Sequence, residues 1–302
     1  VIKYDGLAAG KGVDICESIA VAKNSIKKLL KPGQKIIIED FIKGIELSAI
    51  YICNPNAAKK TIGLPWIKDY KSRDEFNTGP NTGGMGAISH PFCSYKKNDV
   101  YSLNVEIEKI LIKTLVSIAN DYGSNSKYNG FMYLGLMFST SDNKPYILEY
   151  NCRMGDPETQ NILMYLDNNN VDFLDLIGFN NTNYPDNFNL SFLDYKDISG
   201  FCCTVVLAAK GYPINPMKDF YLDTSSIENT DKVKVFHAGT KISNGAIKVT
   251  GGRILTVNAF SDTKQGAIDL AYENILKIKA FSDANLKNED PDLVFFRNDI
   301  GS

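Results

Sequence analysis

The sequence lacks several features on which common classes of protein depend. It has only two histidines, and its six cysteines show no CxxC spacing, so neither a zinc site nor a redox pair is indicated. No apolar run approaches the roughly 20 residues that span a bilayer, and no signal-peptide pattern opens the chain. The net charge of -2 offers no basic surface to nucleic acid or anionic lipid. We therefore expect a cytoplasmic protein with reduced cysteines that binds neither nucleic acid nor membrane.

The composition is that of a globular protein. Hydrophobic residues make up 44% and charged residues 23% of the 302 positions, and this length allows roughly two domains with cores of their own. The chain opens without a methionine, and Val1-Ile-Lys3 reads as the middle of a strand. We therefore expect a fragment of a longer protein.

Hydrophobic periodicity divides the chain into expected elements. Helices are expected where apolar residues recur at helical spacing, at 16–30, 100–122, 159–165, 172–177 and 263–278. Strands are expected in short apolar or alternating runs, at 1–4, 35–39, 46–53, 61–66, 131–139, 145–151, 200–208, 232–237, 246–250 and 253–259. The polar, glycine-rich residues 68–86 are expected to form a long loop that buries little. Asn, Thr, Pro and Asp cluster at 180–189, where we expect a domain boundary.

The strand expected at 145–151 carries a candidate metal site. Alternation along the strand sends Glu149, Asn151 and Arg153 to one face. A carboxylate and an amide oxygen two residues apart are hard donors, of the kind that Mg²⁺ takes alongside nucleotide phosphates. Arg153 adds a planar fork suited to phosphate or carboxylate. The alternative is an ordinary polar strand face turned to water.

Residues 6–12, Gly-Leu-Ala-Ala-Gly-Lys-Gly, form a candidate phosphate loop. Small residues let backbone N–H groups approach a phosphate, and Lys11 supplies a point charge. Lys3, at the end of the preceding strand, adds a second cation. The loop is not a Walker A motif, because the glycine-to-lysine spacing is one residue short and Gly12 stands where Ser or Thr would bind magnesium. A plain β-turn is the alternative.

Two more segments have features of a nucleotide or anion site. The run from Ile37 to Glu46 leads from a strand into a connector, which can offer a backbone C=O and N–H to an adenine edge and an acid to ribose. Its alternative is an edge strand with a turn. Residues 79–86 hold four glycines in eight positions, and exposed amides in such a segment form an anion nest. Its alternative is a flexible surface loop.

Five motifs occur in the chain in the order in which one enzyme family has them. They are Val1-Ile-Lys-Tyr-Asp-Gly-Leu-Ala-Ala-Gly-Lys-Gly-Val13, Ile38-Glu-Asp-Phe41, Thr78-Gly-Pro-Asn-Thr-Gly-Gly-Met-Gly86, Gly130-Phe-Met-Tyr-Leu-Gly-Leu-Met137 and Glu149-Tyr-Asn-Cys-Arg-Met-Gly-Asp-Pro-Glu-Thr-Gln160. Together they resemble the phosphoribosylamine–glycine ligase family, which are ATP-grasp enzymes of purine biosynthesis. Later motifs resemble that family's C-terminal domain, namely Val235-Phe-His-Ala-Gly-Thr240, Thr250-Gly-Gly-Arg253 and Phe296-Arg-Asn-Asp-Ile-Gly301.

The resemblance implies a reaction and a set of site residues. ATP, glycine and 5-phosphoribosylamine would give glycinamide ribonucleotide, ADP and phosphate, through attack of the glycine carboxylate on the γ-phosphate. Mg²⁺ or Mn²⁺ would be held by Glu149 and Asn151. ATP would be bound by Lys3, Gly10, Lys11, Gly12, Glu39, Asp40, Phe41, Ile42 and Glu46. Catalysis would fall to Asp69, Lys71 and Arg153. The substrates would be bound by Gly79, Pro80, Asn81, Thr82, Gly83, Gly84, Met85, Gly86, Asp156 and Glu158.

The chain departs from the family pattern in two places. Where the family usually reads Gln-Asp-His/Tyr-Lys-Arg, this chain has Lys68-Asp-Tyr-Lys-Ser72, so the arginine contact is in doubt unless Arg73 substitutes for it. The family's N-terminal domain, which it uses in binding the ribosylamine, and the start of its lid subdomain are missing. We therefore expect the chain alone to bind nucleotide weakly and to be catalytically deficient.

We expect an α+β protein with an ATP-grasp domain, truncated at its N-terminal side, and a small β-rich C-terminal domain. The expected divisions are a partial lid subdomain at 1–45, an ATP-grasp core at 46–185 and the C-terminal domain at 190–302. A monomer is expected, and a dimer stays open. The alternatives to the ligase are another purine-pathway ATP-grasp ligase with a different carboxylate, or a non-catalytic nucleotide-binding module.

Overall fold

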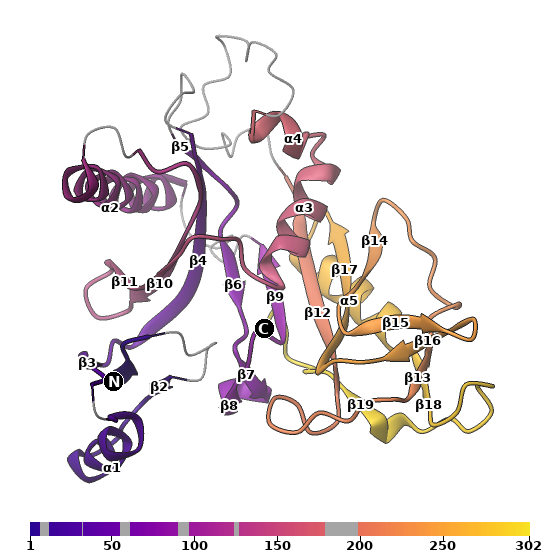
Figure 1. The fold of residues 1–302 in the computed structure, drawn as a ribbon. Coiled ribbons are helices and arrows are strands. Elements are labelled where there is room, and N and C mark those ends of the chain that lie inside the picture. The colour runs from indigo at the N-terminus through magenta and orange to yellow at the C-terminus, as the bar shows by residue number, and fades with distance from the viewer. Residues whose placement is uncertain (7–11, 32, 55–60, 90–96, 124–126, 179–198) are drawn as a thin grey trace.

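The computed structural model describes residues 1–6, 12–31, 33–54, 61–89, 97–123, 127–178 and 199–302, with the backbone alone for residues 97–102 (Figure 1). Three parts of the sequence interpretation lie outside the described residues. These are Gly10 and Lys11 of the candidate phosphate loop and the domain boundary expected at 180–189.

The N-terminal residues form a small unit that lies below the main sheet in Figure 1. Its three antiparallel strands run in the order β2-β1-β3, with bounds Val13–Asp14, Ile2–Tyr4 and Ile36–Ile38. Helix α1 spans Ile19–Leu29 and begins later than the expected 16–30, because Ser18 caps it and accepts a 3.3 Å hydrogen bond from the Val21 amide.

Ten strands of the described chain form one large sheet. Eight of them run in the order β11-β10-β4-β6-β9-β12-β17-β14, while β5 pairs with β4 and β19 pairs with β12. Their bounds are β4 Gly44–Cys53, β5 Thr61–Gly63, β6 Ile67–Asp69, β9 Gly86–Ser89, β10 Gly130–Ser139, β11 Pro145–Asn151, β12 Phe201–Ala209, β14 Val233–His237, β17 Arg253–Ser261 and β19 Val294–Phe295. All of the pairs are antiparallel, and the expected β10–β11 pair is confirmed.

Helices cover both faces of this sheet (Figure 1). On β4, Ala49 and Tyr51 share a core with Leu111 of α2 (Lys97–Tyr122), whereas the alternate residue Ile50 shares one with Ile162 of α3 (Glu158–Asn168). Because successive side chains of a strand point to opposite faces, a strand covered on both sides is apolar throughout. Farther along the sheet, α5 (Lys264–Ile275) packs on β12 and β17.

The rest of the described chain adds short elements. A second sheet has the order β15-β16-β13-β18, with bounds Thr240–Ser243, Ala246–Val249, Tyr221–Asp223 and Lys279–Phe281. Helix α4 covers Phe173–Leu176, and the single turns η1 and η2 cover Glu75–Asn77 and Pro291–Leu293. The mixture of antiparallel sheets and separate helices confirms the α+β class.

The expectation of a long, unburied loop at 68–86 is wrong. Besides β6, η1 and β9, the segment contains the paired strands β7 (Ser72–Asp74) and β8 (Thr78–Asn81), and Tyr70 and Met85 are buried. A Cβ atom on Gly86 would lie 2.7 Å from the side chain of Ile300 and 2.8 Å from the carbonyl of Thr204. Glycine is therefore needed at position 86 because the backbone packs closely in the middle of the sheet, and not because the segment is an exposed loop.

The large sheet is continuous across the expected domain division. Residues 86–88 of β9 pair with 203–205 of β12, so main-chain hydrogen bonds join the predicted core to the predicted C-terminal domain. The three-part division of the chain stays a prediction. None of the helices in the described ranges is long and apolar enough to cross a membrane.

Candidate active site

The candidate metal ligands lie together on β11. The amide of Asn151 donates a 3.3 Å hydrogen bond to the carboxylate of Glu149, which is half-exposed, so both side chains occupy one face as the alternation predicts. The strand carries a bulge: Gly135 pairs with Glu149 and Leu136 with Ile147, which leaves Leu148 as the extra residue. β11 ends at Asn151, so the alternation does not extend to Arg153, whose guanidinium donates to the carbonyl of Met154 at 2.9 Å.

Lys71 connects this strand to β4. Its ammonium forms an ion pair with Glu46 and lies 3.9 Å from Glu149. Burial by itself would lower the pKa of Lys71, but the carboxylates of Glu46 and Asp69 raise the pKa above its ordinary value. The structure thus brings the predicted ribose acid, the predicted catalytic lysine and the predicted metal ligand into one charged row.

Two further acidic side chains adjoin that row, the buried Glu158 and the half-buried Asp69. Glu158 accepts a 3.0 Å hydrogen bond from Ser48, whose hydroxyl is also 2.8 Å from that of Tyr133. Asp69 has one carboxyl oxygen, Oδ1, that is buried without a hydrogen-bond partner. Burial, and then the charge of Glu158, raise the pKa of Asp69 well above its ordinary value, against a lowering effect of Lys71. Asp69 and Glu158 together therefore favour the binding of a hydrogen-bond donor or a cation, which would give Oδ1 of Asp69 a partner.

The small N-terminal unit reaches the site through Lys3. The ammonium pairs with Glu39 at 2.6 Å and donates to the carbonyl of Leu148, at the bulge, at 2.8 Å. Beyond Glu39 the connector to β4 is irregular, with Asp40 and Phe41 exposed to solvent and Ile42 half-buried. Lys3 thus lies beside the candidate metal strand, as a phosphate-contacting cation would have to.

Residues 79–86 fold back onto residues 69–74. The amides of Thr82 and Met85 donate to the carbonyls of Lys71 and Tyr70, at 2.7 and 2.8 Å. Those of Gly83 and Gly84 donate to the hydroxyls of Tyr212 and Thr82, both at 3.0 Å. All four amides are therefore used inside the protein, which leaves fewer exposed amides for an anion nest than the sequence interpretation assumes. The predicted role of residues 79–86 in binding substrates stays a prediction.

Arg73 lies on β7 beside β8, but its guanidinium is taken up by its neighbour in the chain. Its guanidinium makes two 2.7 Å hydrogen bonds to the neighbouring carboxylate of Asp74 at the protein surface. It is therefore not placed as the substitute for the arginine that the family has one position earlier.

Four residues that sequence reasoning did not assign to the site belong to it by contact. Ser48 donates to Glu158 and shares a second hydrogen bond with Tyr133, whereas Tyr212 and Arg253 hold Gly83 from the far side of the predicted domain division. The Thr250-Gly-Gly-Arg253 motif was a signal for Arg253. Ser48 and Tyr133 stand inside apolar strands and carry no sequence signal of a site.

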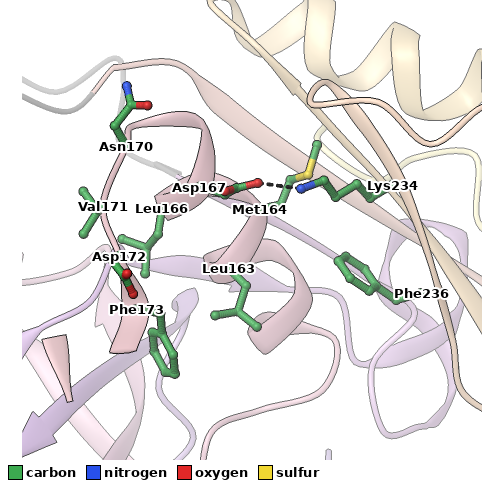
Figure 2. A pocket seen from close by; sticks show the side chains of 10 residues that line it. All are labelled: Leu163, Met164, Leu166, Asp167, Asn170, Val171, Asp172, Phe173, Lys234 and Phe236. Carbon is green, nitrogen blue, oxygen red and sulfur yellow. Dashed lines mark hydrogen bonds and ion pairs between the residues drawn. The ribbon is translucent and has the colours of Figure 1, made fainter. Parts of the chain in front are cut away.

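A cavity of about 600 Å³ lies elsewhere, between α3, α4 and β14 (Figure 2). Asp167 and Lys234 form an ion pair beside it, and Phe173 and Phe236 contribute aromatic rings to its lining. None of the predicted site residues lines it. The candidate site is thus the charged row and not this cavity.

Comparisons with known proteins give matches to both the N-terminal and the C-terminal parts of the chain. Residues 1–159 match the family profile described as phosphoribosylglycinamide synthetase, ATP-grasp (A) domain, and residues 202–302 match phosphoribosylglycinamide synthetase, C domain. The chain is 39% identical over 268 residues to the phosphoribosylamine–glycine ligase of Clostridium acetobutylicum, covering 86% of this chain and 58% of that protein. The ligase of Thermotoga maritima is 36% identical over 275 residues, covering 88% and 60%. The chain therefore spans about three fifths of the length of these relatives.

Solved structures agree in fold. The crystal structure of phosphoribosylamine–glycine ligase from Thermotoga maritima superposes with a TM-score of 0.75 at 33% identity, covering 99% of this chain and 68% of that chain. The biotin carboxylase domain of the Hydrogenobacter thermophilus 2-oxoglutarate carboxylase, in complex with MgADP, ADP and bicarbonate, has a TM-score of 0.61 at 15% identity. It covers 92% of this chain and 56% of that one, and it shows a likeness of fold alone.

Proposed function

The chain belongs to the phosphoribosylglycinamide synthetase family, and we propose that the whole protein ligates glycine to 5-phosphoribosylamine at the expense of ATP. The expected fold, an ATP-grasp portion followed by a β-rich portion, is confirmed by the two family profiles. The observation that carries the proposal is the row Glu46–Lys71–Glu149, with the buried, unpartnered Oδ1 oxygen of Asp69 near Lys71. This row offers oxygen donors for a metal and a cation for a polyphosphate.

The proposed reaction has two balanced steps. An oxygen of the glycine carboxylate attacks the γ-phosphorus of ATP, and the bond to the bridging oxygen breaks to release ADP and give glycyl phosphate. The nitrogen of phosphoribosylamine then attacks the acyl carbon, phosphate leaves with the bonding electron pair, and the nitrogen loses a proton. Both steps need positioning and charge neutralisation more than a nucleophilic side chain, and the described site contains no such nucleophile–base pair.

Magnesium or manganese fits the donor set of β11. The described residues contain no group of three or more acidic, histidine or cysteine side chains that could enclose an ion by themselves. A carboxylate and an amide on one strand face match a site that phosphate oxygens complete. We propose Glu149 and Asn151 as the ligands; an ion bound there would neutralise charge on the transferring phosphoryl group. In the 3.3 Å hydrogen bond between them, the side-chain nitrogen of Asn151 faces Glu149. The amide oxygen, which is the atom that would bind the metal, therefore points away from Glu149.

The remaining site residues take the following proposed roles. Lys3 and Lys11 contact phosphates, with Gly10 and Gly12 giving the backbone room. The connector at Glu39, Asp40, Phe41 and Ile42 meets the adenine, and Glu46 takes the ribose. Asp69, Lys71 and Arg153 act on the acceptor side, beside the reacting carboxylate. Residues 79–86, Asp156 and Glu158 form the acceptor side, on which glycine and the ribosylamine bind.

A coupled ADP-release assay on the whole protein tests the proposal. With ATP, Mg²⁺, glycine and freshly prepared phosphoribosylamine, we expect ADP to form only when all four are present. Alanine, aspartate and bicarbonate, each in place of glycine, distinguish this ligase from relatives that activate other carboxylates. ADP release that does not depend on glycine, or its complete absence, would rule the proposal out.

A further inference from the structure

The first residue of β17, Arg253, extends from the C-terminal part of the chain to the acceptor side. One guanidinium nitrogen, Nη1, donates to the carbonyl of Gly83 at 2.7 Å and to the carbonyl of Asp156. The other, Nη2, pairs with the carboxylate of Asp156 at 2.9 Å. A single planar fork therefore joins two segments that are far apart in the sequence.

Both the backbone N–H and the backbone C=O of Gly83 form hydrogen bonds with side chains. Its amide donates to the hydroxyl of Tyr212 at 3.0 Å, and its carbonyl accepts from Arg253. A Cβ atom at Gly83 would lie 2.9 Å from the guanidinium carbon of Arg253, so the arginine packs directly on the glycine backbone. A side chain at this position would have to displace the guanidinium from its hydrogen bonds. One of the glycines of residues 79–86 is thereby explained by Arg253.

The segments that Arg253 joins meet at Asp69. A Cβ atom on Gly84 would lie 2.6 Å from the ring of Pro157 and 2.9 Å from the free oxygen of Asp69. The Asp156 carboxylate also accepts a 2.9 Å hydrogen bond from Gln160 of α3, which ties it to that helix. The positive charge of Arg253 acts to lower the pKa of Asp69, against the larger effect of burial. The placement of the Asp69 carboxyl thus depends on contacts that Arg253 supplies.

We propose that Arg253 is a positioning residue of the acceptor side, through which the C-terminal part of the chain sets the geometry of residues 83–84 against 156–157 around Asp69. The inference rests on the proposed function and deepens it, because it assigns to the C-terminal part a share in binding the acceptor substrates. Among the described residues, the guanidinium of Arg253 donates hydrogen bonds to Gly83 and Asp156, and not to the candidate metal ligands or the N-terminal unit. Loss of Arg253 is therefore expected to impair the use of glycine and ribosylamine and to leave the affinity for the nucleotide unchanged.

A second ion pair provides a matched control. Lys234 of β14 pairs with Asp167 of α3, which ties the same two parts of the chain together beside the cavity of Figure 2. Within the part of the chain that the structure describes, the side chain of Lys234 pairs with Asp167 and not with residues 79–86 or Asp156. If Arg253 only joined the two parts mechanically, the variants Arg253→Ala and Lys234→Ala would have similar effects.

The experiment compares Arg253→Ala, Arg253→Lys and Lys234→Ala in the whole protein. We expect Arg253→Ala to lower kcat/KM for the acceptor substrates about 100-fold, the effect of a displacement of about 1 Å, while the Kd for MgADP measured by calorimetry changes less than about twofold. Arg253→Lys should recover part of the loss, since an ammonium replaces one donor of the fork but not both. Guanidinium, added well below unfolding concentrations, should raise turnover of Arg253→Ala only. Lys234→Ala should behave as the wild type.

The outcomes separate the inference from the proposed function. If the wild-type protein shows no glycine-dependent ADP release, the proposed function fails before the variants are compared. If the wild type turns over but Arg253→Ala matches Lys234→Ala, or loses MgADP affinity as much as acceptor efficiency, the positioning role is overturned. Arg253→Ala could also lose turnover in proportion to a lowered Tm, with no recovery by guanidinium or by Arg253→Lys. That result would show that Arg253 only stabilises the fold, and it would overturn the positioning role.

Discussion

Replacing Asp299 with asparagine tests how firmly the C-terminal residues hold the segment that carries Asp69 and Lys71. Asp299 accepts two hydrogen bonds from Arg297, at 2.7 and 2.6 Å, and one from the amide of Phe76 at 2.8 Å. Only 1% of the Arg297 side chain is exposed. The substitution keeps the shape of the side chain but leaves a buried guanidinium without its counter-charge.

The expected loss of stability follows from these contacts. Removing one partner of a buried ion pair costs about 3–5 kcal/mol, because the remaining charge stays desolvated. Two charge-assisted hydrogen bonds at about 1.5–3 kcal/mol each give the same order. The other contacts of Arg297, to the carbonyl of Ser72 at 3.1 Å and to the side chain of Asn77 at 3.3 Å, cannot replace a charge. We therefore expect the free energy of unfolding to fall by about 3–5 kcal/mol.

Denaturant unfolding of the whole protein measures this loss, with Asp219→Asn as the control. Asp219 pairs with Lys248 at 2.8 Å, but its side chain is 75% exposed, so its substitution should leave the free energy of unfolding nearly unchanged. Hydrogen exchange should also speed up at Phe76 and Asn77, which are held at positive φ of 55° and 57°. Equal effects of the two substitutions would refute the argument that burial makes the Arg297–Asp299 pair important.

The same pair sets a dependence of stability on pH. Burial alone would raise the pKa of Asp299, but the hydrogen bonds from Arg297 and Phe76 outweigh it and hold the pKa below its ordinary value. A depressed carboxyl pKa contributes stability above the pKa of the unfolded chain, about 3.9, and this contribution disappears as pH falls through the folded value. The difference between wild type and Asp299→Asn should therefore shrink below about pH 4, and a difference that grew there would contradict this assignment.

Two further predictions concern the site itself. Glu149→Gln should lower Mg-ATP turnover by more than about tenfold with unchanged circular dichroism, because its half-exposed side chain supports the metal and not the core; near-normal turnover would place the metal elsewhere. Gly84→Ala should destabilise by about 1–3 kcal/mol and raise the KM of the acceptor substrates, because φ is +116° and the new methyl would meet Pro157 and Asp69. Gly245→Ala, at φ +77° with nothing within 4 Å, is the control: a KM as high as in Gly84→Ala would show that backbone strain alone accounts for the effect.

Elements with a strong local period were predictable. The apolar stripe at 100–122 corresponds to α2 at Lys97–Tyr122, and the strand pair around the turn at 141–144 corresponds to β10 and β11. The failure at 68–86 has a definite cause. Its strands are three or four residues long, and Ile67 pairs with β4 and β9 through partners far along the chain. Such strands are stabilised by their neighbours in the sheet, so no local pattern marks them.

The oxygen donors of the candidate metal site were also predictable, because side chains two residues apart on a strand share a face wherever the strand lies. The bulge at Leu148 was not, since a bulge depends on the register of the partner strand. The position of Arg153 was not predictable either, because β11 ends at Asn151 and the alternation ends with it.

The sequence by itself determined which residues have the chemistry for a metal, a phosphate and a small amine, and it did so through short motifs whose order along the chain identifies the family. Only the tertiary structure decided that Lys71 lies between Glu46 and Glu149, and that Arg253 reaches Gly83, 170 positions away. The physical reason is the distance along the chain over which each effect acts. Periodicity and turn chemistry act over a few residues, whereas these charges meet because a sheet aligns strands from both ends of the chain, and burial then gives each contact its strength.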